Sequence, residues 1–259
     1  MSIKAENIIA GYGDKVILDK LSCAIEDKKI NVVIGKNGSG KSTLFKVLCR
    51  QLKPKEGVVT LNDINFNGLT QIEFAKQIAI LFQENPNLSG LTVRDLVSYG
   101  RYAYTGLMRP MSEEDKVAVD KALEITKTFL YSNTDISELS SGQRQMAYIA
   151  MLAAQESKYM FLDEPTTFLD LKNQFDVLDC LKNLKEEFGK TVIMILHDLN
   201  LAFQYADNII MMKNWGIIHY GKKEEMLKEE YLEETFDTPV KVIKTSDGNA
   251  YCIPARDKR

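Results

Sequence analysis

Nine consecutive residues have the spacing of a phosphate-binding loop: Gly35, Lys36, Asn37, Gly38, Ser39, Gly40, Lys41, Ser42 and Thr43. An apolar run precedes this loop from Ile30 to Ile34, and apolar residues with helical spacing follow it at Leu44, Val47, Leu48 and Leu52. A strand, a glycine-rich turn and a helix are the context that a P-loop needs. This context disfavours the alternative, a glycine-rich turn with an incidental lysine.

The chemistry expected of this loop is the binding of a triphosphate. Glycines let the backbone bend so that successive N–H groups point at phosphate oxygens, and the helix that follows adds the positive end of its dipole. Lys41 is expected to reach the β- and γ-phosphates, and Ser42 to offer its hydroxyl to Mg²⁺. The chain is predicted to bind a nucleoside triphosphate.

Two adjacent acids, Asp163 and Glu164, follow the apolar run Tyr159 to Leu162 and precede Pro165. Acids at the exit of a strand are common, but a buried run that ends in a pair of them is costly unless the charges are used. Downstream of a P-loop, we expect Asp163 to hold Mg²⁺ through water. We expect Glu164 to orient and deprotonate the attacking water.

Three single residues have both a functional and a structural interpretation. Gln83 directly follows the expected strand up to Phe82, so it could reach Mg²⁺ or the attacking water, or be a turn residue. His197 follows the expected strand Thr191 to Leu196, where it could contact a γ-phosphate or be structural. Tyr12 lies between two glycines and could stack on an adenine ring or pack on the surface. The local pattern leaves each alternative open.

The segment Leu139-Ser140-Ser141-Gly142-Gln143 precedes a helical pattern from Arg144 to Gln155. Serines ahead of a helix cap its unpaired N–H groups, which is sufficient as a local explanation. The same geometry also makes an anion site at the helix end. Both interpretations stay open here.

Composition excludes several classes of protein. The 259 residues carry a formal net charge of −3, so a basic footprint for nucleic acid is missing. Apolar runs are of strand length, well short of the roughly 18 residues of a membrane helix, and the start lacks the plan of a secretory signal. Four scattered cysteines are expected to be buried reduced thiols: Cys23, Cys49, Cys180 and Cys252.

The order of patterns along the chain predicts an α/β fold. Short runs from Ile3 to Ile25 suit antiparallel strands, and later strands that alternate with helices imply a parallel sheet with ligands at its carboxyl edge. The P-loop, the Asp163–Glu164 pair and His197 all follow strands, so they are expected to converge there.

The remaining segments predict further elements. From Leu91 to Leu139 we expect a mostly helical insertion, in which Thr92 caps the first helix. The insertion includes a helical stripe at Ala118, Ala122, Ile125 and Phe129 and a loop from Gly100 to Pro110. A charged helix from Lys222 to Glu234, a hairpin around Asp247-Gly248 and frayed residues Arg256 to Arg259 are expected at the end. His219 is expected to be a surface residue of a sheet.

Taken together, these pieces resemble the nucleotide-binding subunit of ABC transporters over nearly the whole chain. Six ordered motifs carry the resemblance: Walker A at Gly35 to Thr43, the Q-loop at Gln83, the signature at Leu139 to Gln143, Walker B at Phe161 to Glu164, the D-loop at Leu169-Asp170 and the H-loop at His197. The fold implied is a P-loop NTPase core with a mixed or parallel sheet, an antiparallel β subdomain and an inserted α-helical subdomain. One domain would cover residues 1–259, with the helical subdomain at about 85–155 and a small C-terminal extension at about 215–259.

The resemblance also implies roles and partners. Tyr12 would stack on adenine, and Gln83 would sense Mg²⁺ and couple to integral-membrane permease subunits. Ser140 and Gly142, with Ser141, Gln143 and Asp170 beside them, would contact ATP held by a second copy in a head-to-tail homodimer. ATP binding would close this dimer, and hydrolysis assisted by Glu164 would reopen it.

Two residues depart from the family pattern. Ser141 stands where the commonest signature has a first glycine, which would cost of order 1 kcal/mol if that position needs a positive φ. Phe168 is bulkier than the usual small residue before the D-loop.

Within the family, the chain is most similar to the ATPases of iron–siderophore, haem and cobalamin importers. The residues are Leu139 to Gln145, Gly100-Arg101-Tyr102, Thr166 to Asp170 and His197 to Asn200. This implies work at the cytoplasmic face of the membrane, supplied indirectly by a substrate-binding protein. The alternative is a soluble ABC ATPase of an iron–sulfur cluster scaffold. DNA-repair relatives carry long coiled-coil insertions, which this sequence lacks.

Overall fold

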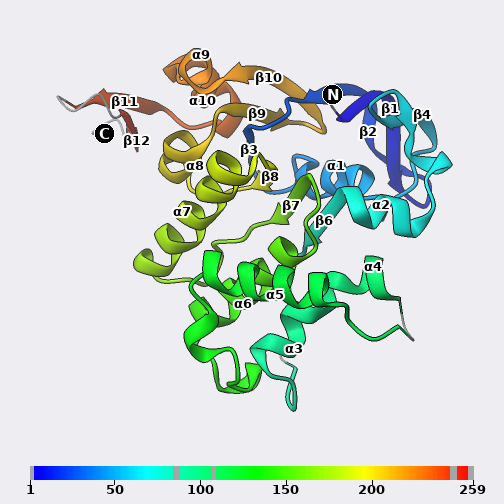
Figure 1. Cartoon of the computed structure of the whole chain (residues 1–259). Helices are drawn as coiled ribbons and strands as arrows, with labels where there is room; N and C mark the ends of the chain where they lie inside the picture. Colours follow the sequence, from blue (N-terminus) through cyan, green and yellow to red (C-terminus); the bar gives the residue numbers. More distant parts are fainter. Residues whose placement is uncertain (1–2, 84–87, 107–108, 246–249, 256–259) are drawn as a thin grey trace. The chain divides into compact units, whose positions relative to one another are not determined.

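The computed structural model describes residues 3–83, 88–106, 109–245 and 250–255 (Figure 1). The chain divides into two compact units, one formed by Met1–Phe66 with Ile193–Arg259 and the other by Asn67–Val192. In sequence, one boundary falls in the 3₁₀ turn Phe66–Gly68 and the other within strand β8 (Thr191–Ile195). Each unit is described by itself.

The first unit opens with an antiparallel sheet in the order β2-β1-β4-β5. Its strands are β1 (Ile3–Tyr12), β2 (Lys15–Ile25), β4 (Glu56–Leu61) and β5 (Ile64–Asn65). The inward side chains Ile3, Ile8 and Leu18 are completely buried. The antiparallel strands expected between Ile3 and Ile25 are confirmed, with Ile3 paired to Ile25 and Tyr12 to Lys15.

Strand β3 (Ile30–Gly35) carries the P-loop and is buried along its whole length. It pairs in parallel with β9 (Asn208–Lys213), which pairs antiparallel with β10 (Gly216–Lys222). Helix α1 (Lys41–Leu48) follows the P-loop, and α8 (Leu199–Tyr205) precedes β9. The helix after the P-loop is one turn shorter than its apolar pattern suggests, because it ends at Leu48, with Cys49 as its C-cap, and leaves Leu52 beyond it.

The end of the first unit differs from the single charged helix expected over Lys222 to Glu234. Two helices form instead, α9 (Lys223–Met226) and α10 (Glu229–Phe236), because the chain is extended at Lys228 between them. This break lets Met226 and Leu232 both be buried.

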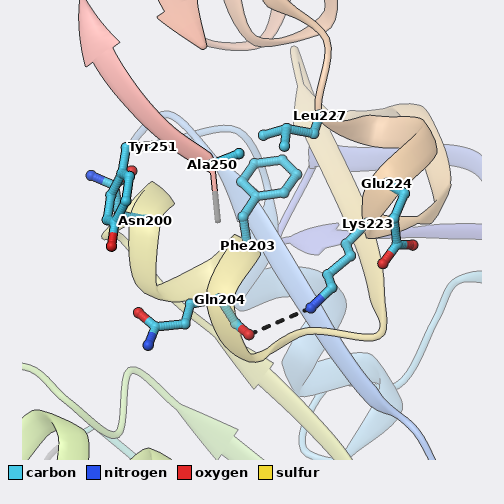
Figure 2. A pocket seen from close by; sticks show the side chains of 8 residues that line it. All are labelled: Asn200, Phe203, Gln204, Lys223, Glu224, Leu227, Ala250 and Tyr251. Atoms are coloured by element: carbon cyan, nitrogen blue, oxygen red, sulfur yellow. Dashed lines mark hydrogen bonds between the residues drawn. The ribbon is translucent and has the colours of Figure 1, made fainter. Parts of the chain in front are cut away.

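Strands β11 (Val240–Lys244) and β12 (Ala250–Pro254) form the expected antiparallel hairpin. Its connecting Asp247-Gly248 lies outside the described residues, as do Arg256 to Arg259. Asn200 of α8 holds this hairpin, accepting from the Cys252 N–H (2.7 Å) and donating to the Cys252 carbonyl (3.3 Å). Figure 2 shows the small pocket beside this contact, of about 160 Å³, where Phe203 lies near Leu227 and Lys223 donates to the Gln204 carbonyl (3.5 Å).

The second unit contains a parallel pair and a helical insertion. Strand β6 (Ile78–Leu81) runs parallel to β7 (Tyr159–Asp163) with Leu81 opposite Leu162. The helices are α2 (Gln71–Gln77), α3 (Val93–Ser98), α4 (Tyr102–Thr105), α5 (Glu113–Ile125), α6 (Ser141–Ala154) and α7 (Leu171–Phe188), with 3₁₀ turns at Tyr99–Arg101, Phe129–Tyr131 and Ile136–Glu138. Thr92 caps α3 as expected, with Asp95 completing a capping box. The two parallel pairs, the antiparallel β9–β10 pair, the β subdomain and the helical insertion agree with the predicted fold class.

Two expectations within the insertion are wrong. The stretch from Gly100 to Pro110 is largely helical in its described part rather than a loop. Gly100 is there because a Cβ would lie 2.2 Å from the Met151 carbonyl of α6, so the glycine marks close packing and not a turn. Phe129 lies beyond the end of α5 and is exposed, so it is not part of the buried stripe.

A buried arginine holds parts of the helical insertion together. Arg101 donates to Asp115 on α5 (2.9 Å), to the carbonyl of Ala154 at the end of α6 (2.8 Å) and to Glu156 just beyond that helix (2.7 Å). Both side chains of the Arg101–Asp115 pair are under 10% exposed. Arg101 therefore joins three parts of the insertion, namely its own 3₁₀ turn, α5 and the end of α6.

The structure also tests the predictions for the cysteines, His219 and membrane-spanning helices. All four cysteines are free thiols, with Cys49, Cys180 and Cys252 buried and Cys23 half-buried. His219 is not an open surface residue, since it stacks on Tyr231 and contacts Glu234 (2.8 Å). Among the described residues, no helix is both long and apolar enough to cross a bilayer.

Candidate functional site

The P-loop has the backbone shape that a phosphate cradle needs. Three of its residues have positive φ: Gly35 at 152°, Gly38 at 78° and Gly40 at 102°. A Cβ on Gly35 would lie 2.3 Å from the Met212 carbonyl, so only glycine lets β3 leave the sheet beside β9. Helix α1 then begins without a side-chain cap, which leaves its first N–H groups for a ligand.

The side chains of the loop divide into buried and exposed ones. Lys41 is 5% exposed, and its ammonium donates to the carbonyls of Gly35 (2.8 Å) and Lys36 (2.9 Å). Ser39 is also buried, and its hydroxyl has no hydrogen-bond partner among the described residues. Asn37 and Ser42 are exposed, whereas Thr43 packs inside. A buried, unsatisfied hydroxyl beside an uncapped helix start fits a phosphate group.

Tyr12 ends β1 with about half of its side chain exposed. The Lys46 ammonium of α1 lies 5.6 Å from the centre of its ring. The ring therefore presents surface beside the helix that follows the P-loop, which leaves stacking on a base chemically open to it.

His197 follows β8 at the same edge as the P-loop. The Leu196 N–H donates to the Val33 carbonyl of β3 (3.3 Å), two residues before Gly35. His197 itself is exposed, and Asp198 caps α8 by accepting from the Leu201 N–H (3.0 Å).

In the second unit, Glu164 is contacted by side chains from two directions. Gln83 Nε2 donates to Glu164 Oε2 (2.8 Å), and Thr167 Oγ1 donates to the same oxygen (3.1 Å). The parallel register explains the first contact, since Leu81 opposite Leu162 puts Gln83 and Glu164 at matching positions past the strand ends. Asp163 is nearly buried at the end of β7.

The start of α6 is built by a capping box. Ser140 Oγ accepts from the Gln143 N–H (3.3 Å), and Gln143 Oε1 accepts from the Ser140 N–H (3.1 Å). Ser141 is the first helical residue and is not among the residues with positive φ, so the backbone strain considered for a serine at this position does not arise. Gly142 lies directly against Asn173 of α7.

Two contacts near this helix were not expected from the sequence. Gln145 Nε2 donates to the Pro165 carbonyl (2.8 Å), which links α6 to the loop that carries Glu164. Asp170 caps α7 by accepting from the Asn173 N–H (2.8 Å), while the neighbouring Phe168 is 88% exposed at a positive φ of 63°. No composition or spacing signal marks Gln145, because its partner is a backbone carbonyl.

The sequence matches the family model described as ABC transporter over residues 18–167. It is 42% identical over 256 residues to the probable siderophore transport system ATP-binding protein YusV of Bacillus subtilis (strain 168), covering 98% of this chain and 92% of YusV. It is 40% identical over 255 residues to the petrobactin import ATP-binding protein FpuD of Bacillus anthracis, covering 98% of this chain and 93% of FpuD. The dimeric structure of MJ0796, a bacterial ABC transporter cassette, superposes with a TM-score of 0.74 at 29% identity, covering 85% of this chain and 98% of that one.

The fold, the P-loop and these matches together place the chain in the ABC transporter family. Within that family it is an ATP-binding protein, an ABC-type ATPase whose work is coupled to transport.

Proposed function

We propose that this chain is the ATP-hydrolysing subunit of an importer for iron–siderophore or closely related chelates. The similarity to YusV and FpuD, which spans 98% of the chain, supports the cargo class. The pair of hydrogen bonds at Glu164 is the observation that carries hydrolysis, because it orients a carboxylate beside the Gln83 side chain.

The chemistry follows from the residues on each unit. Lys41 and the P-loop N–H groups bind the phosphates, Tyr12 stacks on the adenine, and His197 contacts the γ-phosphate. Ser42 and Gln83 would offer oxygen ligands to Mg²⁺, and Asp163 would hold the ion through water. A bound ion would neutralise charge on the phosphates. Glu164 accepts the proton of the attacking water.

We further propose that two copies work as a head-to-tail homodimer. Helix α6 has fourteen residues, and its N-terminal end is suited to an anion. This end, formed by Ser140, Ser141, Gly142 and Gln143, would complete the nucleotide site of the other copy. Asp170 would contact the other copy next to that nucleotide site. The dimeric structure of the MJ0796 cassette supports the pairing of two copies.

Both units would belong to one nucleotide-binding domain over residues 1–259, acting at the cytoplasmic face of a membrane. The helical subdomain, at about 85–155, and the Gln83 loop would pass the motion to permease subunits. A substrate-binding protein would deliver cargo to those subunits, and nucleic acid would play no part. The segment 215–259 would form a small C-terminal extension.

The test is to purify the chain with its membrane partner and measure ATP hydrolysis in proteoliposomes. Ferric hydroxamate and ferric catecholate chelates, each presented with the binding protein, are expected to stimulate hydrolysis in the wild type. A Lys41→Ala complex is the control that lacks nucleotide binding. Co-purification with a soluble iron–sulfur scaffold and no permease would contradict the proposal. Stimulation by haem or cobalamin alone would keep the importer and assign its cargo to that class of chelate.

A further inference from the structure

The outer side of the P-loop is held by a turn far away in the sequence. Asn214 and Trp215 connect β9 to β10 as a two-residue hairpin turn, with Lys213 paired to Gly216. The Trp215 indole Nε1–H donates to the Gly38 carbonyl (3.1 Å), and the Trp215 backbone N–H donates to the Ser39 carbonyl (3.1 Å). Two successive carbonyls of the P-loop are therefore fixed by one residue.

Fixing these carbonyls also fixes the N–H groups that face a phosphate. In a trans peptide the C=O and the following N–H point in opposite directions. None of the described peptide bonds is cis. When Trp215 holds the Ser39 carbonyl on the outer side, the Gly40 N–H is turned toward the inside of the loop. The donor geometry of the cradle thus depends on contacts made behind it.

Trp215 occupies a position that the backbone does not favour. Asn214 and Trp215 have φ values of 46° and 71°, as a type I′ hairpin turn requires, and glycine is the preferred second residue of that turn. A bulky residue in the left-handed region is strained. A glycine at position 215 could not make the indole hydrogen bond to the Gly38 carbonyl, so this bond explains why a tryptophan occupies a strained position.

A second contact holds the start of the same loop. Asp237, which ends α10, accepts from the Lys36 ammonium (3.2 Å) and from the Lys213 ammonium (2.6 Å). A cavity of about 400 Å³ lies between these side chains, the P-loop and the turn. The Lys36 pair is half exposed, so we expect it to contribute less than the indole bond.

We propose that Trp215 is a positioning residue for nucleotide binding, which holds the P-loop in its phosphate-binding shape through the Gly38 and Ser39 carbonyls. The proposal rests on the P-loop function given above. Since Trp215 is the only tryptophan of the chain, its fluorescence also reports on the loop.

The first test compares nucleotide affinity in matched variants. Trp215→Phe keeps an aromatic ring and the backbone bond but removes the indole donor, and Tyr220→Phe on β10, the strand that follows the turn, is the control. The loss of one neutral hydrogen bond in Trp215→Phe should raise the Kd for Mg-ATP by about two- to tenfold. KM should rise by the same factor with kcat within about twofold, and Tyr220→Phe should match the wild type. A Kd change below twofold in a folded Trp215→Phe, even with lower thermal stability, would overturn the proposal.

The second test uses the unaltered chain and needs no folded variant. Titration with Mg-ATP should change the tryptophan emission along the same saturation curve that calorimetry gives, and Lys41→Ala should abolish the change. Unchanged emission in a wild type that binds ATP by calorimetry would contradict the proposed role of Trp215 and leave the P-loop function standing. Unchanged ATP affinity in Lys41→Ala would instead contradict the P-loop function on which the proposal rests.

Discussion

At the scale of single residues, the proposed hydrolysis depends on how Glu164 is oriented. Two donors, Gln83 Nε2 and Thr167 Oγ1, bond the same carboxylate oxygen, and Glu164 has a positive φ of 53°. A non-glycine residue in that region costs of order 1 to 3 kcal/mol unless its surroundings hold it, and such strain gathers at functional sites. The hydrogen bonds and the backbone both favour one placement of this carboxylate.

Replacing Glu164 with glutamine tests its role as the base. Glutamine keeps the shape and can still accept from Thr167, but it cannot accept a proton from water. ATP hydrolysis should fall by roughly 10²- to 10⁴-fold while the Kd for ATP stays within about twofold. Phosphate release and calorimetry measure the two quantities, with the exposed Glu124→Gln on α5 as the control. Hydrolysis at the wild-type rate would show that another group is the base.

Thr167 gives a smaller and separate effect. Thr167→Val keeps the volume of the side chain and removes one of the two donors to Glu164. We expect hydrolysis to fall by about two- to tenfold, the value of one hydrogen bond, with ATP affinity unchanged. Steady-state hydrolysis at saturating ATP checks this, and an unaltered kcat would mean that Gln83 alone orients the carboxylate.

Residues could be identified from the sequence where their expected role depends only on their neighbours along the chain. The Asp163–Glu164 pair could be singled out because a buried strand that ends in two charges is unusual. The contact between Gln83 and Glu164 could not be predicted, because it depends on β6 lying next to β7, and strand order has no local signal. Gln145 was missed for a related reason, since its partner is a backbone carbonyl.

At the scale of elements, hydrophobic periodicity located helices but not their ends. The strain considered for Ser141 depended on a positive φ at that position, whereas Ser141 is the first residue of α6 and is not among the residues with positive φ. Gly100 was interpreted as a loop residue, although it serves close packing against α6. Glycines and serines have several uses, and only the tertiary contacts distinguish them.

The Arg101–Asp115 pair should make the helical insertion sensitive to acid. Burial raises the pKa of Asp115, but hydrogen bonds from Ser112 and Arg101 outweigh it and hold this pKa below its ordinary value. A carboxyl with a lowered pKa stabilises the fold above its unfolded pKa of about 4, and the contribution is lost as pH falls through the folded value.

Asp115→Asn should therefore lower the free energy of unfolding by about 1 to 3 kcal/mol at pH 7, because Arg101 loses the buried one of its two charged partners. The difference from the wild type should shrink as pH falls below about 4, because Asp115 is protonated first in the unfolded chain and then, at its lower pKa, in the folded one. Denaturant unfolding across this range measures both effects. A difference that stays constant with pH would contradict the ionised pair.

At the scale of the whole molecule, the residues proposed for ATP hydrolysis are divided between the two units. Lys41, Tyr12 and His197 belong to one, and Gln83, Glu164 and the start of α6 belong to the other. Either unit alone lacks part of the chemistry. If Ser140 and its neighbours act on ATP held by a second copy, hydrolysis also depends on assembly.

The most direct test is the mass of the Glu164→Gln chain in solution, measured by light scattering during gel filtration. At saturating Mg-ATP this variant should bind nucleotide, hydrolyse it slowly and elute as a dimer, and it should return to a monomer when ATP is omitted. Lys41→Ala should remain monomeric under both conditions. A Glu164→Gln chain that stays monomeric at saturating Mg-ATP, alone and in complex with its permease, would contradict the shared-site account.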